Sequence, residues 1–184
     1  LVVPKKLADG TKAPGRVCID PRALNAKLIP EKYPMPRVRD VFEHLAGRSI
    51  FSSLDLEQSF LQLRVHPPDQ RTLSFTWKGR HYMFIGTPFG LTPTSAVLHR
   101  TVMTVLAGSS SAVAFQDDIT VGSASAEEHL DDLLDTIERL TAVNLRLRLS
   151  KCQFFRSSLC LLGHGFIANG VAIDRRKLSH LSAS

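Results

Sequence analysis

The chain has 184 residues, of which 43% are hydrophobic and 22% charged, and its formal net charge is +6. This composition is typical of a globular domain that buries a core, and it excludes a disordered chain. No apolar run approaches the roughly 20 residues of a membrane span, and no signal peptide opens the chain. The three cysteines, Cys18, Cys152 and Cys160, are odd in number and lack metal-ligand spacing, so we expect reduced thiols in an intracellular protein.

Charge is distributed unevenly along the chain. Residues 1–80 and residues 145–184 each carry a net charge of +6, whereas residues 81–144 carry −6. Basic flanks around an acidic middle are typical of a protein that grips a polyanion on both sides of a metal-binding centre. A solvated surface with uneven charge is the alternative interpretation, and the pattern alone does not decide between them.

The first fifty residues predict a hairpin followed by a helix. Strands are expected at residues 1–3 and 16–20, with a turn at Asp9-Gly10 between them. Pro36 and Gly47 mark the start and end of the helix, and its apolar face recurs at helical spacing in Val38, Val41, Phe42 and Leu45.

A long strand region is expected from residue 50 to residue 65, and then a small hairpin over residues 71–85 that turns at Lys78-Gly79. Asp55 lies inside the first strand between two leucines. A carboxylate on a half-buried strand is costly without a partner or a metal, although some strand aspartates simply pair with arginine. A loop over residues 87–92 then leads to a helix for which Thr94 is the candidate cap.

The most informative stretch runs from Ala112 to Gly122. Two apolar runs flank a polar tip made of Gln116, Asp117 and Asp118, which predicts a tight β-hairpin. Adjacent carboxylates at such a tip are either ordinary turn residues or part of a divalent metal site. The second interpretation requires a third carboxylate from elsewhere in the chain.

The next segment contains the clearest helix. Ser125 and Glu128 form a capping-box pattern, and an apolar stripe for core packing follows at Leu130, Leu133, Leu134, Ile137 and Leu140. Residues 145–149 alternate leucine with arginine as a strand. A last hairpin is expected to turn at Asn169-Gly170, and Asp174 is the expected cap of a further helix.

From residue 50 to residue 149 the expected order is strand, helix, strand, strand, helix, strand, with one insertion. This is the split βαβ order of a ferredoxin-like α+β fold, in which the first strand lies beside the central hairpin. We therefore expect Asp55 to meet Asp117 and Asp118. Three convergent carboxylates repel one another unless cations bind between them. Two Mg²⁺ ions, or Mn²⁺ in their place, suit such oxygen ligands and in-line phosphoryl transfer, which indicates a nucleotide polymerase.

Short motifs also follow one another along nearly the whole chain: Val3-Pro4-Lys5-Lys6, Arg16-Val17-Cys18-Ile19-Asp20-Pro21-Arg22-Ala23-Leu24-Asn25, Tyr33-Pro34-Met35-Pro36, Leu54-Asp55-Leu56, Pro88-Phe89-Gly90-Leu91-Thr92, Phe115-Gln116-Asp117-Asp118, Glu128-His129-Leu130, Leu149-Ser150-Lys151-Cys152 and Leu162-Gly163-His164. In this order and spacing they resemble the reverse transcriptase of gypsy-type LTR retrotransposons. The resemblance implies the fingers and palm of a right-hand polymerase that extends a primer on an RNA or DNA template.

The resemblance implies three groups of site residues. Catalysis and metal binding are assigned to Asp55, the carbonyl of Leu56, Asp117, Asp118 and Lys151, with Lys151 assisting the departure of pyrophosphate. The incoming nucleotide is assigned to Lys6, Arg16, Phe60, Phe89, Gly90 and Gln116, with Phe60 excluding a ribose 2′-hydroxyl. The primer end is assigned to Leu162, Gly163 and His164. For Lys6, Arg16 and Lys151 a solvated surface base is the alternative.

Several positions depart from the pattern of the resembled family. Phe115 and Gln116 stand where Tyr and a small or apolar residue are usual, and Ser59 replaces a glycine. Gly15 stands where an aromatic is usual, and Pro93-Thr94-Ser95 replaces Asn-Ala-Pro. None of these changes removes a carboxylate. Together, however, they are consistent with the alternative interpretation that the chain is an inactive copy that only binds nucleic acid or a protein partner.

The resemblance also implies how the chain is divided: 1–49 fingers segment, 50–65 first palm strand, 66–90 returning fingers hairpin and loop, 91–150 rest of the palm, 151–174 primer-grip region and 175–184 the truncated start of the next element. Thumb, connection and ribonuclease H regions are expected in a longer polyprotein. The expected partners are the template, the primer and deoxynucleoside triphosphates, and no membrane is expected to bind. The expected location is intracellular, in cytoplasmic virus-like particles and the nucleus. An RNA-recognition module shares the strand–helix order, but its Gly-Phe-rich stacking signature is absent.

Overall fold

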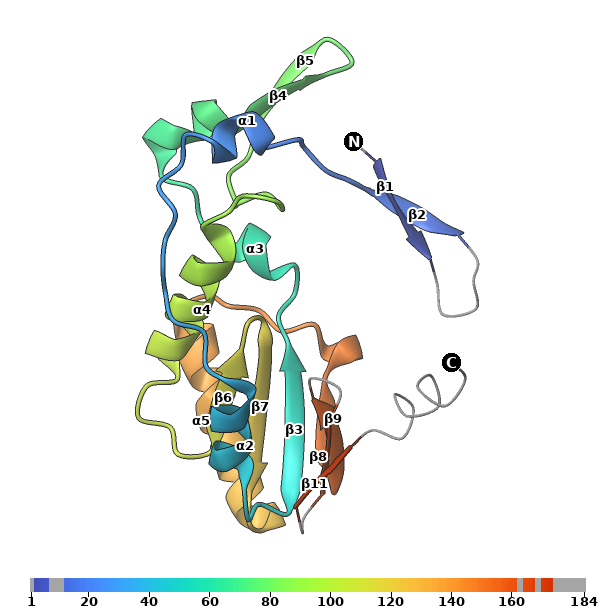
Figure 1. Cartoon of the computed structure of the whole chain (residues 1–184), viewed down its shortest axis with the longest axis vertical. Helices are drawn as coiled ribbons and strands as arrows, with labels where there is room; N and C mark the ends of the chain where they lie inside the picture. The colour runs from blue at the N-terminus through green and yellow to red at the C-terminus, as the bar shows by residue number, and fades with distance from the viewer. Residues whose placement is uncertain (1, 7–11, 162–163, 168–169, 174–184) are drawn as a thin grey trace. The chain divides into compact units, whose positions relative to one another are not determined.

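A computed structural model describes residues 2–6, 12–161, 164–167 and 170–173. The chain divides into two compact units, which we describe separately: Leu1–Lys32 with Gln58–Leu98, and Tyr33–Glu57 with His99–Ser184. Figure 1 labels most of their helices and strands. None of the helices in the described part of the chain has the length and apolar character needed to cross a membrane.

The second unit is built on an antiparallel sheet in which the strands follow the order β6-β7-β3-β8 (Figure 1). These strands are β3 (Ile50–Asp55), β6 (Ala112–Phe115), β7 (Asp118–Ser123) and β8 (Gln153–Arg156). β3 pairs with β7 along its whole length, from Ile50 opposite Ser123 to Asp55 opposite Asp118. Because residues directly opposite each other share a face, Asp55 and Asp118 lie on one face at one end of the sheet.

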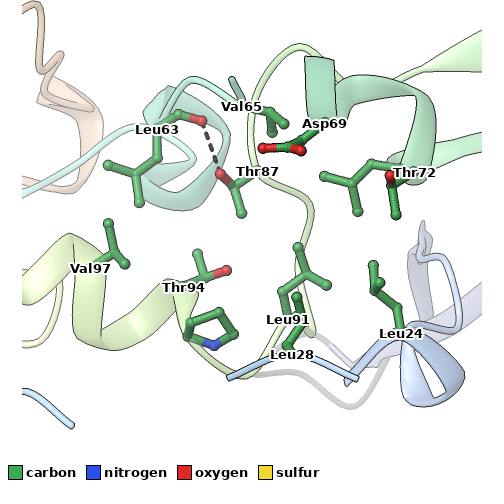
Figure 2. Close-up of a pocket in the computed structure, with 12 residues that line it drawn as sticks. Leu24, Leu28, Leu63, Val65, Asp69, Thr72, Thr87, Leu91, Thr94 and Val97 are labelled. Atoms are coloured by element: carbon green, nitrogen blue, oxygen red, sulfur yellow. Dashed lines mark hydrogen bonds between the residues drawn. The ribbon is translucent and has the colours of Figure 1, made fainter. Parts of the chain in front are cut away.

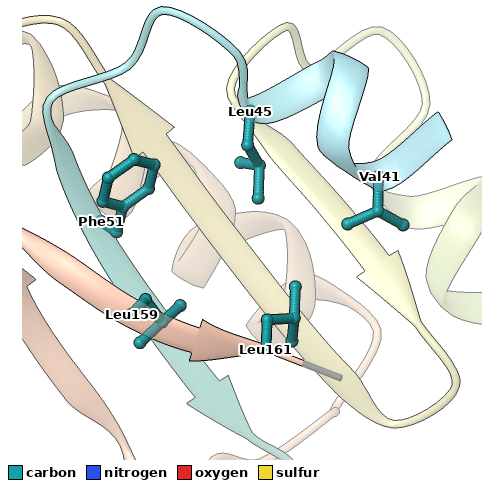
Figure 3. Close-up of a cluster of buried hydrophobic side chains, with 5 residues drawn as sticks. All are labelled: Val41, Leu45, Phe51, Leu159 and Leu161. Atoms are coloured by element: carbon teal, nitrogen blue, oxygen red, sulfur yellow. The ribbon is translucent and has the colours of Figure 1, made fainter. Parts of the chain in front are cut away.

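Helices cover both faces of this sheet. α5 (Ala126–Ala142) packs on one face and α2 (Val38–Leu45) on the other (Figure 1). On the α2 side, a hydrophobic cluster joins α2 to β3 and to β9 (Ser158–Leu161), as Figure 3 shows; its members are Val41, Leu45, Phe51, Leu159 and Leu161. Gly122 permits this close packing, because a Cβ there would lie 2.9 Å from Cδ2 of Leu45.

The buried face of α5 differs from the predicted leucine stripe. Leu133 and Leu140 are buried as predicted, but Leu130 and Leu134 are about half exposed, at 50% and 49%. His129 and Thr136 are buried in their place. The prediction is wrong for Leu130 and Leu134 only, because leucine spacing alone does not reveal that polar side chains with hydrogen-bond partners occupy the same face. At the start of the helix, the hydroxyl of Ser125 accepts from the amide of Glu128, which confirms the predicted cap.

The strand predicted at residues 145–149 is wrong. Leu147 forms only an isolated bridge with Leu56, and residues Leu149–Lys151 form a 3₁₀ turn, η2. The fourth strand of the sheet is β8, which begins at Gln153. Beyond it, β9, β10 (His164–Ile167) and β11 (Gly170–Ile173) form a second sheet that includes the predicted last hairpin. Asn169 and Asp174 lie outside the described residues.

The first unit contains two predicted hairpins. β1 (Val2–Lys6) pairs with β2 (Lys12–Val17), and β4 (Ser74–Trp77) pairs with β5 (Arg80–Met83) across Lys78-Gly79, so both hairpins are confirmed. The returning strand of the first hairpin, expected at residues 16–20, ends at Val17 instead. Asp9-Gly10 lies outside the described residues. The remaining elements are α1 (Arg22–Asn25), α3 (Ser59–Gln62), the 3₁₀ helix η1 (Pro67–Leu73) and α4 (Thr94–Val105), which begins in this unit.

Two predictions in this region are corrected. The strand expected over residues 50–65 stops at Asp55, and Gln58, with φ 45°, turns the chain into α3. Residues 61–65, whose alternating pattern predicted a strand, form only an isolated β-bridge, between Arg64 and Gly86. A Cβ at Gly86 would collide with the carbonyl oxygen of Leu61, so the close approach requires glycine. Thr94, which Figure 2 shows, does not cap α4, because its buried hydroxyl has no hydrogen-bond partner among the described residues.

Candidate active site

The predicted hairpin at the polar tip is present. Phe115 pairs with Asp118, and Gln116 and Asp117 form the two-residue turn between them. Gln116 has φ 59°, in the left-handed region that favours glycine and asparagine. The turn therefore presents two adjacent aspartates at the end of a rigid strand pair.

The conformation of Gln116 gives a prediction for stability. Gln116→Asn is expected to leave the free energy of unfolding unchanged or to raise it, whereas Gln116→Val is expected to lower it by about 1–2 kcal/mol, because a β-branched side chain opposes positive φ. Urea unfolding of the two variants checks this. Equal stabilities would contradict it. Valine, although small and apolar as the resembled family prefers, is thus poorly suited to this turn.

The backbone of Asp55 is held by two residues that flank η2, Arg148 and Cys152. Its carbonyl oxygen accepts from the amide of Arg148 at 2.8 Å, and its amide donates to Sγ of Cys152 at 3.4 Å. The thiol of Cys152 in turn donates to the carbonyl of Arg148 at 3.4 Å. Sequence reasoning assigned no role to Arg148 or Cys152. The only available signal was the position of Cys152 in the Leu-Ser-Lys-Cys motif.

Lys151 joins the same group of residues. Its Nζ donates to Oδ2 of Asp55 at 3.0 Å, although the two residues are 96 positions apart. The lysine side chain is 53% exposed and the aspartate side chain 27% exposed, so water screens the ion pair. The structure thus brings together Lys151, Asp55 and, directly opposite Asp55, Asp118.

The electrostatics of the site centre on Asp118. Partial desolvation of its carboxyl group raises the pKa of Asp118 even though the residue as a whole is exposed, and the negative charges of Asp117 and Asp55 raise it further, while Lys151 opposes them. A raised pKa in the folded protein means that the ionised form is disfavoured there. This carboxylate therefore destabilises the fold as pH rises through its pKa, and a bound cation would relieve the repulsion.

We tested whether these residues fit a divalent metal ion. The donor chemistry fits, because two carboxylates face each other across β3 and β7 and a third adds its charge to theirs. Yet among the residues that the structure describes, no group of three or more His, Cys, Asp or Glu side chains is arranged to hold a metal. The ammonium of Lys151 supplies the positive charge beside Asp55. Asp55, Asp117 and Asp118 supply carboxylates of the right chemistry for an ion, but in the structure they are not arranged as one group of metal ligands.

Some residues assigned to the nucleotide lie in the first unit. The rings of Phe60 and Phe89 pack with centroids 5.4 Å apart. Gly90 has φ 97°, and a Cβ on it would lie 3.0 Å from Cγ of Pro21. The side chain of Asn25 fixes this loop by donating to the carbonyl of Gly90 at 2.8 Å and accepting from the amide of Thr92 at 3.0 Å. Asn25 belonged to a quoted motif but had been given no role.

The remaining predicted residues are placed only by their backbone or not at all. Lys6 ends β1 opposite Lys12, and Arg16 lies opposite Val3 in the same hairpin. His164 begins β10. Leu162 and Gly163 lie outside the described residues. These assignments stay predictions.

Comparison with known proteins identifies the class. The family model described as "Reverse transcriptase (RNA-dependent DNA polymerase)" matches residues 3–166, so the chain belongs to this family. Solved structures agree on the fold: a foamy viral protease–reverse transcriptase in complex with double-stranded DNA has a TM-score of 0.87 at 20% identity, covering 100% of this chain and 32% of that one. A foamy viral protease–reverse transcriptase in complex with an RNA/DNA hybrid has a TM-score of 0.79 at 19% identity, and the match covers 98% of this chain and 24% of that one.

The relatives that the chain resembles in sequence are polyproteins of gypsy-type retrotransposons. It is 31% identical over 172 residues to the retrovirus-related Pol polyprotein from transposon 297 of Drosophila melanogaster, covering 92% of this chain and 16% of the relative. It is 32% identical over 180 residues to the retrovirus-related Pol polyprotein from transposon 412 of Drosophila melanogaster, and the match covers 96% of this chain and 15% of the relative. The chain therefore spans about a sixth of the length of these relatives.

Proposed function

We propose that this chain supplies the fingers and palm of an RNA-directed DNA polymerase that extends a primer on an RNA or DNA template. The observation that carries the proposal is the meeting of Asp55, Asp118 and Lys151 at one end of the β3–β7 pair, in a chain of the reverse transcriptase family. The strand order β6-β7-β3-β8 supports the finer proposal of a ferredoxin-like palm. The described residues of the first unit would then belong to the fingers.

In the proposed reaction, the carboxylates of Asp55, Asp117 and Asp118 would hold two Mg²⁺ or Mn²⁺ ions. When bound, these ions supply charge neutralisation for the attacking and leaving oxygens of nucleotidyl transfer. The turn at Gln116 and Asp117 fixes the position of two carboxylates, and the Cys152 and Arg148 contacts fix that of Asp55. Lys151 carries a proton at Nζ, where its positive charge offsets negative charge on departing pyrophosphate.

The test is primer extension by a polyprotein segment that contains this chain with its downstream regions. Extension of a DNA primer on an RNA template, dependent on Mg²⁺ or Mn²⁺, is the expected result. Absence of extension with either ion, from a segment that is folded and binds primer–template, would overturn the proposal. That outcome would instead favour an inactive copy that only binds nucleic acid.

Sugar selectivity gives a second prediction for the proposed enzyme. Phe60→Ala is expected to increase ribonucleotide incorporation relative to deoxynucleotide incorporation by at least about tenfold, because a steric difference of about one heavy atom in a binding pocket is worth about 1–3 kcal/mol. Phe60→Tyr, which keeps the ring that packs on Phe89, is the matched control. If selectivity survives Phe60→Ala, the ring is only part of the packing around Phe89.

A further inference from the structure

His129 is a fully buried histidine on α5, and both of its ring nitrogens have partners. Nε2 lies 2.7 Å from Oγ of Ser52 on β3, and Nδ1 lies 2.9 Å from Oγ of Ser123 on β7. Both serines are fully buried as well. The imidazole thus links α5 to the two strands that carry Asp55 and Asp118, on the face of the sheet opposite α2.

The neighbouring groups determine where each proton lies. Ser123 donates its hydroxyl proton to Oδ2 of Asp132 at 2.6 Å, so its oxygen can only accept from His129, which places a proton on Nδ1. If the ring is neutral, Nε2 accepts the hydroxyl proton of Ser52, and the oxygen of Ser52 is free to accept from elsewhere. Burial lowers the pKa of His129, against the charges of Asp132 and Glu128, which favours the neutral ring.

Ser52 does accept a further hydrogen bond, and its donor lies in an irregular part of β8. The amide of Phe155 donates to Oγ of Ser52 at 3.2 Å. Phe51 pairs with Arg156 and Ser53 with Gln153, so two residues of β8 lie opposite one residue of β3, which is a β-bulge. Within it Phe155 has φ 50°, an unfavourable value for a bulky residue.

The histidine also supports the side chain of Phe155. The two rings meet edge to face, with centroids 4.9 Å apart and an angle of 82° between their planes. One hydrogen bond and one ring contact, both from the His129–Ser52 pair, therefore hold the strained residue in place. The bulge sets the register in which β8 runs along β3.

This register matters because η2 lies immediately before β8. Lys151 ends η2, and Cys152 separates it from Gln153, so the start of β8 fixes where both side chains meet Asp55. We propose that neutral His129, with its proton on Nδ1, is a positioning residue that holds the Phe155 bulge through Ser52 and thereby places Lys151 beside Asp55. The part of this proposal that concerns Lys151 in catalysis rests on the proposed polymerase function.

The first test needs no activity. Nitrogen-15 NMR of the full chain at neutral pH is expected to show His129 neutral and protonated on Nδ1, and Ser52→Ala is expected to speed hydrogen exchange at the amide of Phe155 at least tenfold. Ser53→Ala, one position along the same strand, is the matched control and should leave this amide protected. A proton on Nε2, or unchanged exchange in Ser52→Ala, would overturn the proposal.

The second test uses the active polyprotein segment. Ser52→Ala is expected to lower kcat of nucleotide addition about tenfold or more with a smaller change in KM, since small misplacements of reacting groups are costly. Adding Phe155→Gly, which adopts positive φ without strain, is expected to restore much of the rate. Lys151→Met should cost less in the Ser52→Ala background than alone. If the effects of Ser52→Ala and Lys151→Met on the rate are additive, the link between the bulge and Lys151 is overturned. If the unsubstituted segment is inactive, the proposed function is refuted, and the first test alone decides whether His129 and Ser52 hold the bulge.

Discussion

Asp118→Asn is expected to reduce primer extension by at least about a hundredfold, the scale that a small misplacement of reacting groups alone can cost. Asn keeps the size of the side chain but removes a negative charge that a divalent ion requires. Asp118 faces Asp55 directly, so no other residue of β7 can supply a carboxylate at that position. The measurement is the rate of nucleotide addition at saturating Mg²⁺.

The same substitution is expected to leave the fold intact or to strengthen it. Burial, Asp117 and Asp55 all raise the pKa of Asp118, so its ionised form opposes folding at neutral pH. The neutral amide removes this repulsion, and the stability gained relative to the parent should shrink as pH falls below the pKa of Asp118. Asp131→Asn, at an exposed position of α5, is the control and should change neither rate nor stability appreciably. A loss of activity that follows from unfolding would contradict this expectation.

The sequence predicted best where local chemistry alone decides the structure. Turn residues located the hairpins at Lys78-Gly79 and at Gln116 and Asp117, because two-residue turns demand particular backbone angles. The order of strands and helices was sufficient to place Asp55 opposite Asp118 across more than sixty residues. The carboxylate pair of the site was therefore accessible to sequence reasoning.

Prediction failed where distant contacts override a short pattern. Alternation over five residues suggested strands at 61–65 and 145–149, yet in each stretch a single bridge is all that forms. The ion pair of Lys151 with Asp55 and the bulge at Phe155 depend on where η2 and β8 meet β3, which no local pattern encodes. In the sequence, His129 was identified only as part of a motif. Its burial could not be predicted, because it depends on hydrogen-bond partners on β3 and β7 that the local sequence does not reveal.

The largest effect on stability is expected in α5. Leu140→Ala should lower the free energy of unfolding by about 2–5 kcal/mol, because the side chain is 1% exposed and its removal leaves a cavity. Leu130→Ala, on the same helix but 50% exposed, should change it by no more than about 0.5 kcal/mol. Alanine favours helix at both positions, so propensity cancels and the difference reports burial alone. Urea unfolding followed by circular dichroism measures both. Similar losses at the two positions would contradict this difference in burial and place Leu130 in the core.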